Sequence, residues 1–226
     1  MRIFSRRAAL SAFAALALAA CGSASGNGAG ASPADSGDGL PDMVLGDPDA
    51  PVTLVEYASI TCPACLQFHE TVMPTIKEDY VETGKVKFIF REFPTPPANV
   101  AVAGFAIARC AGADKYFDVL DDMFDAQPGI LMAARSGAVR PALEEIASRH
   151  GIAPGEEFDA CVNNSDIRAD IADVILSSEE YQVASTPTLI LQGRKVENSL
   201  QSRTAEGLSA LIDLELEAIG IAEGEQ

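Results

Sequence analysis

Two patterns meet in the segment Ser59-Ile60-Thr61-Cys62-Pro63-Ala64-Cys65-Leu66-Gln67-Phe68-His69. The apolar run Val52–Tyr57 just before it is typical of a buried strand, whereas the residues after Cys62 have helical spacing. The two cysteines therefore lie at a strand-to-helix turn. A helix N-terminus presents unpaired N–H groups and a partial positive charge, which lower the pKa of a cysteine such as Cys62. Cys65, one turn further, can close a disulfide with Cys62.

The same two cysteines could instead be half of a zinc site or two unreactive core cysteines. A zinc site needs a second pair of cysteine or histidine ligands at ligand spacing. The remaining candidates are scattered singly along the chain: Cys21, Cys110, Cys161, His69 and His150. The pattern favours redox chemistry over metal binding, and we expect neither a metal nor a cofactor.

Glu56 interrupts the apolar run before the cysteines. A carboxylate in a strand buried on both faces is costly, so it is rarely kept without a use. Lying six residues before Cys62, it would run beneath the helix start and could exchange a proton with Cys65 when the disulfide opens or closes. Alternatively, Glu56 lies at the strand edge in contact with water. His69, one turn after Cys65, could tune Cys65 or be an ordinary half-exposed histidine.

The order of these motifs resembles the thioredoxin-fold disulfide oxidoreductases of the DsbA family. Residues Val52–Pro94 contain a strand, Cys-Pro-x-Cys, a long helix broken near Pro74 and a second strand, and Val183–Leu191 is similar to the family's cis-proline loop and following strand. The resemblance implies an α/β thioredoxin-like fold in which Glu56 is the buried acid and Pro187 the cis-proline.

The Thr186-Pro187 dipeptide is the predicted substrate-binding element. Proline cannot donate to a sheet, so at a strand entrance it leaves the backbone of Thr186 free to pair with an extended substrate. In the family this peptide bond is cis and packs against the active-site disulfide. Ser185 replaces the glycine that often precedes Thr-Pro in the family.

A helical insertion is predicted between the second and third core strands, at 95–180. Helical spacing covers 98–111, 115–125, 139–150 and 165–180, with breaks at Gly112, Pro128-Gly129 and Pro154-Gly155. The insertion resembles that of the DsbA family, where it forms one wall of a groove beside the dithiol. The thioredoxin-like domain is predicted at 42–94 and 181–222, ending in a hairpin around Gly193 and a helix at 205–219.

Residues 1–20 have the features of a secretory signal. Arg2, Arg6 and Arg7 precede an apolar stretch too short to span a bilayer. Residues 5–10 partly match a twin-arginine signal without its usual phenylalanine, so Sec and Tat export both remain open. Leu18-Ala19-Ala20-Cys21 looks like a bacterial lipobox, which would make Cys21 the lipidated first residue; ordinary cleavage after Ala19 is the alternative.

The remaining composition describes a tether and one domain. Residues 21–41 are mainly Gly, Ala and Ser and are predicted to form a flexible, lipid-anchored tether. Without the signal the formal net charge changes from −17 to −20, which argues against nucleic acid and against electrostatic docking on anionic lipid.

Cys110 and Cys161 lie within the predicted insertion. With Cys21 lipidated and Cys62 paired with Cys65, they are the remaining pair, and an exported chain is expected to join them in a structural disulfide. Two buried free thiols are the alternative.

The sequence thus predicts an exported, lipid-anchored thiol-disulfide oxidoreductase of the cell envelope. It would act on unfolded or reduced exported proteins from the periplasmic or extracytoplasmic face, as a monomer, and the resemblance implies a DsbB-like membrane oxidase as partner. Pro63-Ala64 lacks the histidine of the strongest family oxidant, so a reductase or isomerase with the same site remains open. A copper metallochaperone and a non-catalytic adaptor with the same fold remain open as well.

Overall fold

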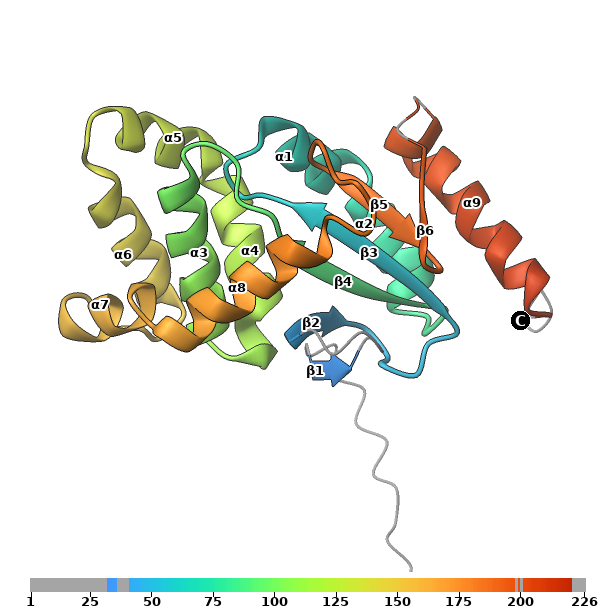
Figure 1. Cartoon of the computed structure of the whole chain (residues 1–226), viewed down its shortest axis with the longest axis horizontal. Helices are drawn as coiled ribbons and strands as arrows, with labels where there is room; N and C mark the ends of the chain where they lie inside the picture. Colours follow the sequence, from blue (N-terminus) through green and yellow to red (C-terminus); the bar gives the residue numbers. More distant parts are fainter. Residues whose placement is uncertain (1–31, 36–40, 198, 200, 221–226) are drawn as a thin grey trace, which may run out of the picture.

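A computed structural model describes residues 32–35, 41–197, 199 and 201–220 (Figure 1). The predicted signal peptide at 1–20 and the predicted lipidation site at Cys21 lie outside these residues. In the described part of the chain, no helix combines the length and the apolar character needed to cross a bilayer.

The described residues form one six-stranded sheet with the strand order β1-β2-β4-β3-β5-β6. β3 and β4 run parallel, and the other neighbouring strands run antiparallel. The strands are β1 (Ser32–Asp35), β2 (Pro41–Leu45), β3 (Val52–Ala58), β4 (Val86–Glu92), β5 (Thr188–Leu191) and β6 (Arg194–Lys195). The predicted hairpin is present, because β5 and β6 are joined by Gln192 and Gly193, both at positive φ.

The central pair, β3 and β4, is joined by three helical segments, α1 (Pro63–Thr71), α2 (Met73–Ile76) and η1 (Lys77–Val81). The two strands are near-continuous apolar runs, as expected for strands buried on both faces. α1 ends three residues before Pro74, which has no N–H to donate to the preceding turn. The predicted break in the long helix is therefore confirmed.

The two faces of β3 meet different parts of the molecule, because successive side chains of a strand point to opposite faces. Val55 and Tyr57 belong to a small cluster that includes Val174 of α8 (Ser165–Ser177). Leu54 and Ala58 belong to the main core, which contains Cys65 of α1. Glu56 shares the face of Leu54 and Ala58, so its side chain points toward the helix that carries the cysteines.

The segment between β4 and β5 is helical, as predicted, and lies beside the sheet (Figure 1). Together with α8, its elements are α3 (Ala98–Cys110), η2 (Ala113–Lys115), α4 (Tyr116–Asp125), α5 (Gln127–Arg135), α6 (Val139–Arg149) and α7 (Glu156–Val162). A final helix, α9 (Ala205–Ala218), follows the short η3 (Gln201–Arg203) and packs against α2 and β3.

Two helices of the insertion differ from the prediction. Pro128-Gly129 was predicted to be a break, but Pro128 lies in the first turn of α5. Proline is tolerated there because the first N–H groups of a helix have no partner within it. α7 is a second unpredicted helix and begins directly after Gly155, whose φ is +89°.

The sheet begins earlier than the predicted domain boundary at residue 42. β1 lies within the predicted tether at 21–41 and pairs with β2, which in turn pairs with β4. The prediction missed β1 because Ser32-Pro33-Ala34-Asp35 has no apolar strand pattern. Pairing with an open sheet edge uses the backbone and needs no such pattern.

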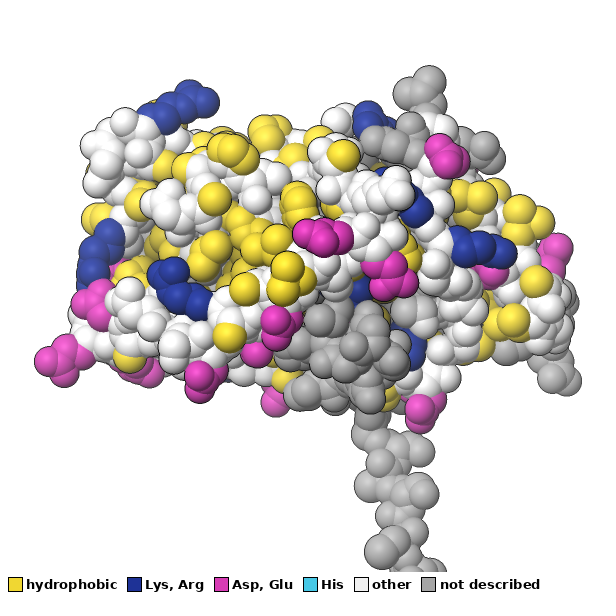
Figure 2. Space-filling model, viewed as in Figure 1, with side chains coloured by type: hydrophobic (Ala, Val, Ile, Leu, Met, Phe, Trp, Pro, Cys, Tyr) yellow, Lys and Arg dark blue, Asp and Glu magenta, His cyan; other side chains and the backbone are white. Residues whose placement is uncertain are grey.

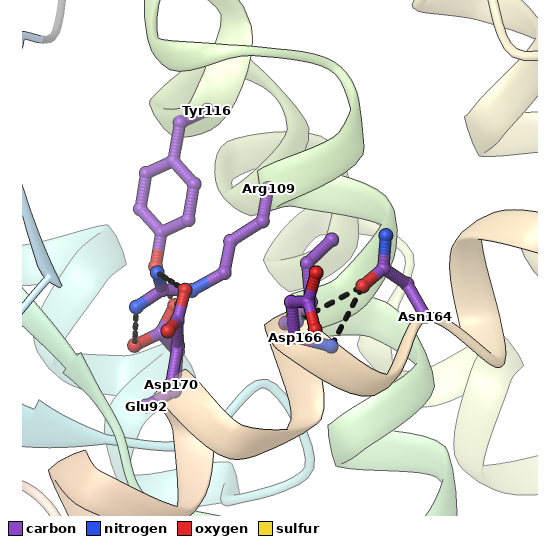
Figure 3. A network of polar contacts seen from close by, with 7 residues as sticks. Glu92, Arg109, Tyr116, Asn164, Asp166 and Asp170 are labelled. Carbon is purple, nitrogen blue, oxygen red and sulfur yellow. Dashed lines mark hydrogen bonds and ion pairs between the residues drawn. The ribbon is translucent and has the colours of Figure 1, made fainter.

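The end of β4 carries two oppositely charged buried side chains on opposite faces. On one face, Arg91 donates two hydrogen bonds to the carboxylate of Asp42, at 3.1 and 2.8 Å, and one to the hydroxyl of Tyr57, at 2.8 Å. On the other face, Glu92 accepts hydrogen bonds from Nε and Nη2 of Arg109, at 2.6 and 2.9 Å, and from the hydroxyl of Tyr116, at 2.8 Å (Figure 3). The contacts of Glu92 fix α3 and α4 of the insertion to β4, whereas those of Arg91 join β4 to β2 and β3.

The structure joins Cys110 and Cys161 in a disulfide, with a Cα–Cα distance of 5.9 Å. This is the pairing expected from the sequence. The bridge connects the last residue of α3 to α7. On the chain-entropy model, closing a loop of this length stabilises the fold by about 4 kcal/mol.

We predict that Arg109→Leu lowers the free energy of unfolding by about 3–5 kcal/mol, because it leaves the charge of Glu92 buried without its partner. Urea unfolding measures the loss. The matched control is Asp170→Asn, since the Asp170 side chain is 39% exposed and lies 3.4 Å from Arg109. A surface pair of this kind contributes less than about 1 kcal/mol. Equal losses in the two variants would contradict the prediction.

Candidate active site

Cys62 and Cys65 lie at the start of α1, as the sequence predicts. Cys62 is the N-cap residue in an extended conformation, and Pro63 is the first residue of the helix. The carbonyl of Cys62 accepts hydrogen bonds from the N–H groups of Cys65 and Leu66, at 3.1 and 3.2 Å. Both sulfurs are free thiols; Cys62 is half-buried and Cys65 is fully buried. Cys62 is thus the sulfur that another protein can reach.

The surroundings of Cys62 lower its pKa to about 5. The largest cause is the hydrogen bond from the Cys65 thiol, which stabilises the thiolate, while burial of the sulfur opposes the shift. The side chain of Thr186 and the N–H groups of Cys65 and Ala64 lower the pKa further. These N–H groups belong to the first turn of α1, so the helix start acts on Cys62 in the predicted direction.

Cys65 has the opposite character. Burial raises the pKa of the Cys65 thiol far above its ordinary value, and its hydrogen bond to Cys62 and the negative charge of Glu56 add to the shift. The N–H of Ser59, 3.5 Å from the sulfur, acts against it. At neutral pH Cys62 is therefore a thiolate while Cys65 holds its proton.

The loop before β5 lies directly beside the half-buried sulfur. The Thr186–Pro187 peptide bond is cis, as the family resemblance implies. The sulfur of Cys62 lies 3.5 Å from the carbonyl oxygen of Thr186, which accepts a hydrogen bond when Cys62 is protonated. Thr186 and Pro187 are thus brought to the dithiol from a segment more than a hundred residues away.

Glu56 is fully buried, so the alternative of a water-exposed strand edge is wrong. One carboxylate oxygen, Oε2, lies 2.9 Å from Nε2 of His69, and Oε1 has no hydrogen-bond partner among the described residues. The polar contact of His69 thus goes to Glu56 rather than to Cys65. The spacing contains the signal for this contact, since His69 lies four residues after Cys65 on the helix face that meets Glu56.

The turn before Cys62 is held by residues that the sequence does not single out. The hydroxyl of Ser59 accepts hydrogen bonds from the N–H groups of Thr61 and Thr95, at 3.3 and 3.2 Å. From the insertion, the buried amide of Gln127 donates to the carbonyls of Ile60 and Cys62, at 2.9 and 3.1 Å. Nothing in the sequence points to Gln127, because it lies beside the segment predicted to be a break.

We predict that Gln127→Leu raises the pKa of Cys62 and lowers the free energy of unfolding by about 2 kcal/mol, because the carbonyl of Ile60 loses the amide donor, the carbonyl of Cys62 keeps only its two helix donors, and the first turn of α1 is less firmly held. Thiolate absorbance against pH measures the first effect and urea unfolding the second. Gln67→Leu, an exposed position on α1, should change neither. An unchanged Cys62 pKa in Gln127→Leu would show that the amide does not position the thiol.

Comparison with known proteins agrees with this site. A family model described as Thioredoxin matches residues 39–214. A Rickettsia conorii protein named for protein-disulfide oxidoreductase activity is 33% identical over 177 residues, which cover 78% of this chain but only 61% of the relative. Disulfide bond formation protein D of Bacillus subtilis is 26% identical over 169 residues, 69% of each protein.

A crystal structure extends the likeness to three dimensions. Alpha-DsbA1 of Wolbachia pipientis superposes with a TM-score of 0.70 at 27% identity, over 80% of this chain and 96% of that one. The family model spans well over half of this chain, and the Wolbachia structure has the same fold as this chain. This protein therefore belongs to the thioredoxin family, and within it the chain is similar to disulfide oxidoreductases of the DsbA type.

Proposed function

We propose that this chain is a thiol-disulfide oxidoreductase that introduces disulfides into exported proteins through Cys62 and Cys65. The observation that carries the proposal is the asymmetry of the two thiols. Cys62 is half-buried with a pKa lowered to about 5, and Cys65 is buried with a raised pKa. A low pKa makes Cys62 a good leaving group, and burial keeps Cys65 away from substrates.

In the oxidising direction, a substrate thiolate attacks Sγ of Cys62 in the Cys62–Cys65 disulfide. The bond between the two sulfurs breaks, and Cys65 leaves with the electron pair and takes up a proton. A second substrate thiolate then attacks the substrate sulfur of the mixed disulfide, and Cys62 leaves as a thiolate. The substrate gains a disulfide, and the two cysteines end in the reduced state that the structure has.

Two surface features support an unfolded protein as the substrate. The cis Thr186–Pro187 bond lies at the entrance to β5, where the backbone of Thr186 can pair with an extended chain. Hydrophobic side chains also gather over α3 and α8 on one face of the molecule (Figure 2), and Leu176 of α8 is exposed. Exposed apolar patches often mark binding sites for apolar partners.

The oxidising direction follows from the thiolate. In the reduced folded protein the pKa of Cys62 is about 5, below the unfolded value of about 8.5. A lowered pKa stabilises the folded reduced protein. This stabilisation is complete at pH values above the unfolded pKa, and it is lost as the pH falls through about 5. The oxidised protein has no Cys62 thiolate and therefore lacks this stabilisation. Reduction of the Cys62–Cys65 disulfide is thus favoured at neutral pH, and the disulfide is readily transferred to a substrate.

The cellular setting is part of the same proposal. In this proposal the chain is exported through the signal at 1–20, is lipidated at Cys21 and acts as a monomer from the periplasmic or extracytoplasmic face. A DsbB-like membrane enzyme reoxidises it. Each of these features fits an enzyme that acts on newly exported chains. The support is the sequence pattern before residue 42 and the likeness to DsbA-type proteins.

We predict a reduction potential for Cys62–Cys65 nearer about −120 mV than about −270 mV. The measurement is equilibration of a soluble form starting after Cys21 with glutathione buffers. A value near about −270 mV would contradict the oxidase direction and favour a reductase or isomerase. A protein that binds Cu(I) stoichiometrically but exchanges no disulfide would instead be a metallochaperone.

The stability of the two redox forms should differ with pH. We expect the reduced form to unfold at higher urea than the oxidised form at pH 7, and this difference to shrink as the pH falls through about 5, where Cys62 becomes protonated. Parallel urea titrations of the reduced and oxidised protein measure it. A difference that stays constant across this pH range would mean that the Cys62 thiolate is not its source.

Lipidation of Cys21 is expected to appear as added acyl mass on the mature N-terminus. Intact mass spectrometry of the protein extracted from membranes measures it, and Cys21→Ser serves as the control. A mature chain that begins at Ala20 or carries an unmodified Cys21 would overturn the anchor without affecting the redox assignment.

A further inference from the structure

Glu56 is sealed from water behind the active site. Its side chain is 0% exposed, as is that of Cys65. β3 is paired on one side with β4 and on the other with β5, so neither edge of this strand is open to water. A proton that Glu56 takes from Cys65 therefore has to leave through a side chain that contacts the carboxylate. The polar side chain in contact with it is His69, at 2.9 Å.

The imidazole of His69 is held in place by aromatic rings. It stacks on Phe124 of α4, with 4.1 Å between ring centroids and 26° between planes. Phe68 and Phe90 meet it edge-on, at 6.1 and 6.0 Å. The Nε2 atom is therefore directed at Glu56. An imidazole can accept a proton on one nitrogen and release one from the other, which a fixed orientation turns into a directed path.

His69 also reaches a surface pocket of about 390 Å³. Its side chain is 10% exposed and forms part of the pocket wall. The charged groups around the ring are Glu56 of β3 on the inside and, in the pocket, Glu70 of α1, Lys77 of η1, and Asp121 and Asp125 of α4. The pocket thus supplies water and proton-carrying groups on the outer side of the ring.

We propose that His69 passes protons between Glu56 and the water of this pocket whenever Cys65 gains or loses its proton. The inference rests on the proposed function and adds a proton exit to the site, separate from the half-buried sulfur that meets the substrate. His69 does not touch the reacting sulfurs and acts through Glu56.

The transfers balance in both directions. When Cys65 resolves a mixed disulfide, its thiol gives its proton to Glu56, Sγ of Cys65 attacks Sγ of Cys62, and the substrate sulfur leaves with the electron pair of the broken bond. Glu56 then passes the proton to Nε2 of His69, and the other ring nitrogen releases a proton to water. When a substrate thiolate opens the Cys62–Cys65 disulfide, a proton from the pocket follows the reverse path to Cys65.

A purely structural histidine would only donate a hydrogen bond to Oε2 and pack against Phe124. His69→Gln separates the two roles, because a glutamine amide can donate to Oε2 but cannot take up and release a proton. The readout is the rate at which Cys65 resolves a coloured thionitrobenzoate mixed disulfide on Cys62, followed by stopped flow from about pH 5 to 9.

We expect His69→Gln to slow this step by about tenfold or more and to change its pH profile, within the range of general acid–base effects. The reduction potential should stay within error of the parent, because it reports equilibrium and not proton flow. In His69→Ala, added imidazole should enter the pocket and restore part of the rate, whereas in Glu56→Gln it should restore none.

The chain offers a matched control in its other histidine. His150 also contacts a carboxylate, with Nε2 2.7 Å from Oδ2 of Asp122, and its side chain is 13% exposed, but it lies on the insertion after α6. His150→Gln should leave rate and pH profile unchanged. Together these are the two histidines of the sequence, so any imidazole titration in the profile belongs to one of them.

A parental rate and pH profile in a folded His69→Gln protein would overturn the proposal while leaving the oxidoreductase assignment intact. If His69→Gln does not fold, two other variants test the proton path. These tests are the recovery of the resolution rate by imidazole in His69→Ala, and the resolution rate and pH profile of His69→Asn. If the unmodified protein itself does not resolve the mixed disulfide, the proposed function fails, and the proton path fails with it.

Discussion

The position of the end of β3 in the sheet determines the redox site. β3 is hydrogen-bonded to β4 along seven residue pairs and to β5 on its other side, so the chain leaves the sheet at Ala58 in a fixed direction. Shortly afterwards it caps α1 with Cys62. Because the side chains of β3 alternate, the same geometry that delivers Cys62 to the helix start also turns Glu56 toward Cys65 and His69. One strand thus positions Cys62, Cys65 and Glu56 together.

The helical insertion completes this site as well as covering it. Gln127 of α5 binds the carbonyls of Ile60 and Cys62 from outside the thioredoxin-like core. The insertion is in turn fixed to β4 by the buried pair of Glu92 and Arg109 and closed on itself by the Cys110–Cys161 disulfide. A change at Gln127 therefore acts on the backbone of Cys62 through a direct hydrogen bond. The insertion thus helps to hold the backbone that carries Cys62.

Much of this arrangement was predictable, and the parts that were not share a physical cause. The strands Val52–Ala58 and Val86–Glu92, the break before Pro74, the insertion between strands and the place of Cys62 all follow from local patterns that a sequence displays directly. Three features were missed. β1 depends on backbone pairing, the helix that begins near Pro128 depends on the tolerance of proline at a helix terminus, and the role of Gln127 depends on a contact across the fold. None of these produces a periodic pattern of apolar residues in the sequence. The contact between His69 and Glu56 was predictable only in part. The helix face that carries His69 follows from the spacing, but the complete burial of Glu56 beneath that face does not.

Glu56 breaks the rule that buried polar groups are paired, because its Oε1 has no partner among the described residues. Such a group costs stability, and the fold could remove the cost with an apolar residue of similar size. The chain instead holds a charge next to a thiol whose pKa that same charge raises. The proposed exchange reaction gives this charge a use, because Cys65 would gain and lose a proton in a place that water does not reach. A buried carboxylate with one oxygen on His69 and the other without a partner can carry that proton, and an apolar side chain cannot. The unsatisfied oxygen is thus a local cost in stability that the proposed proton path would explain.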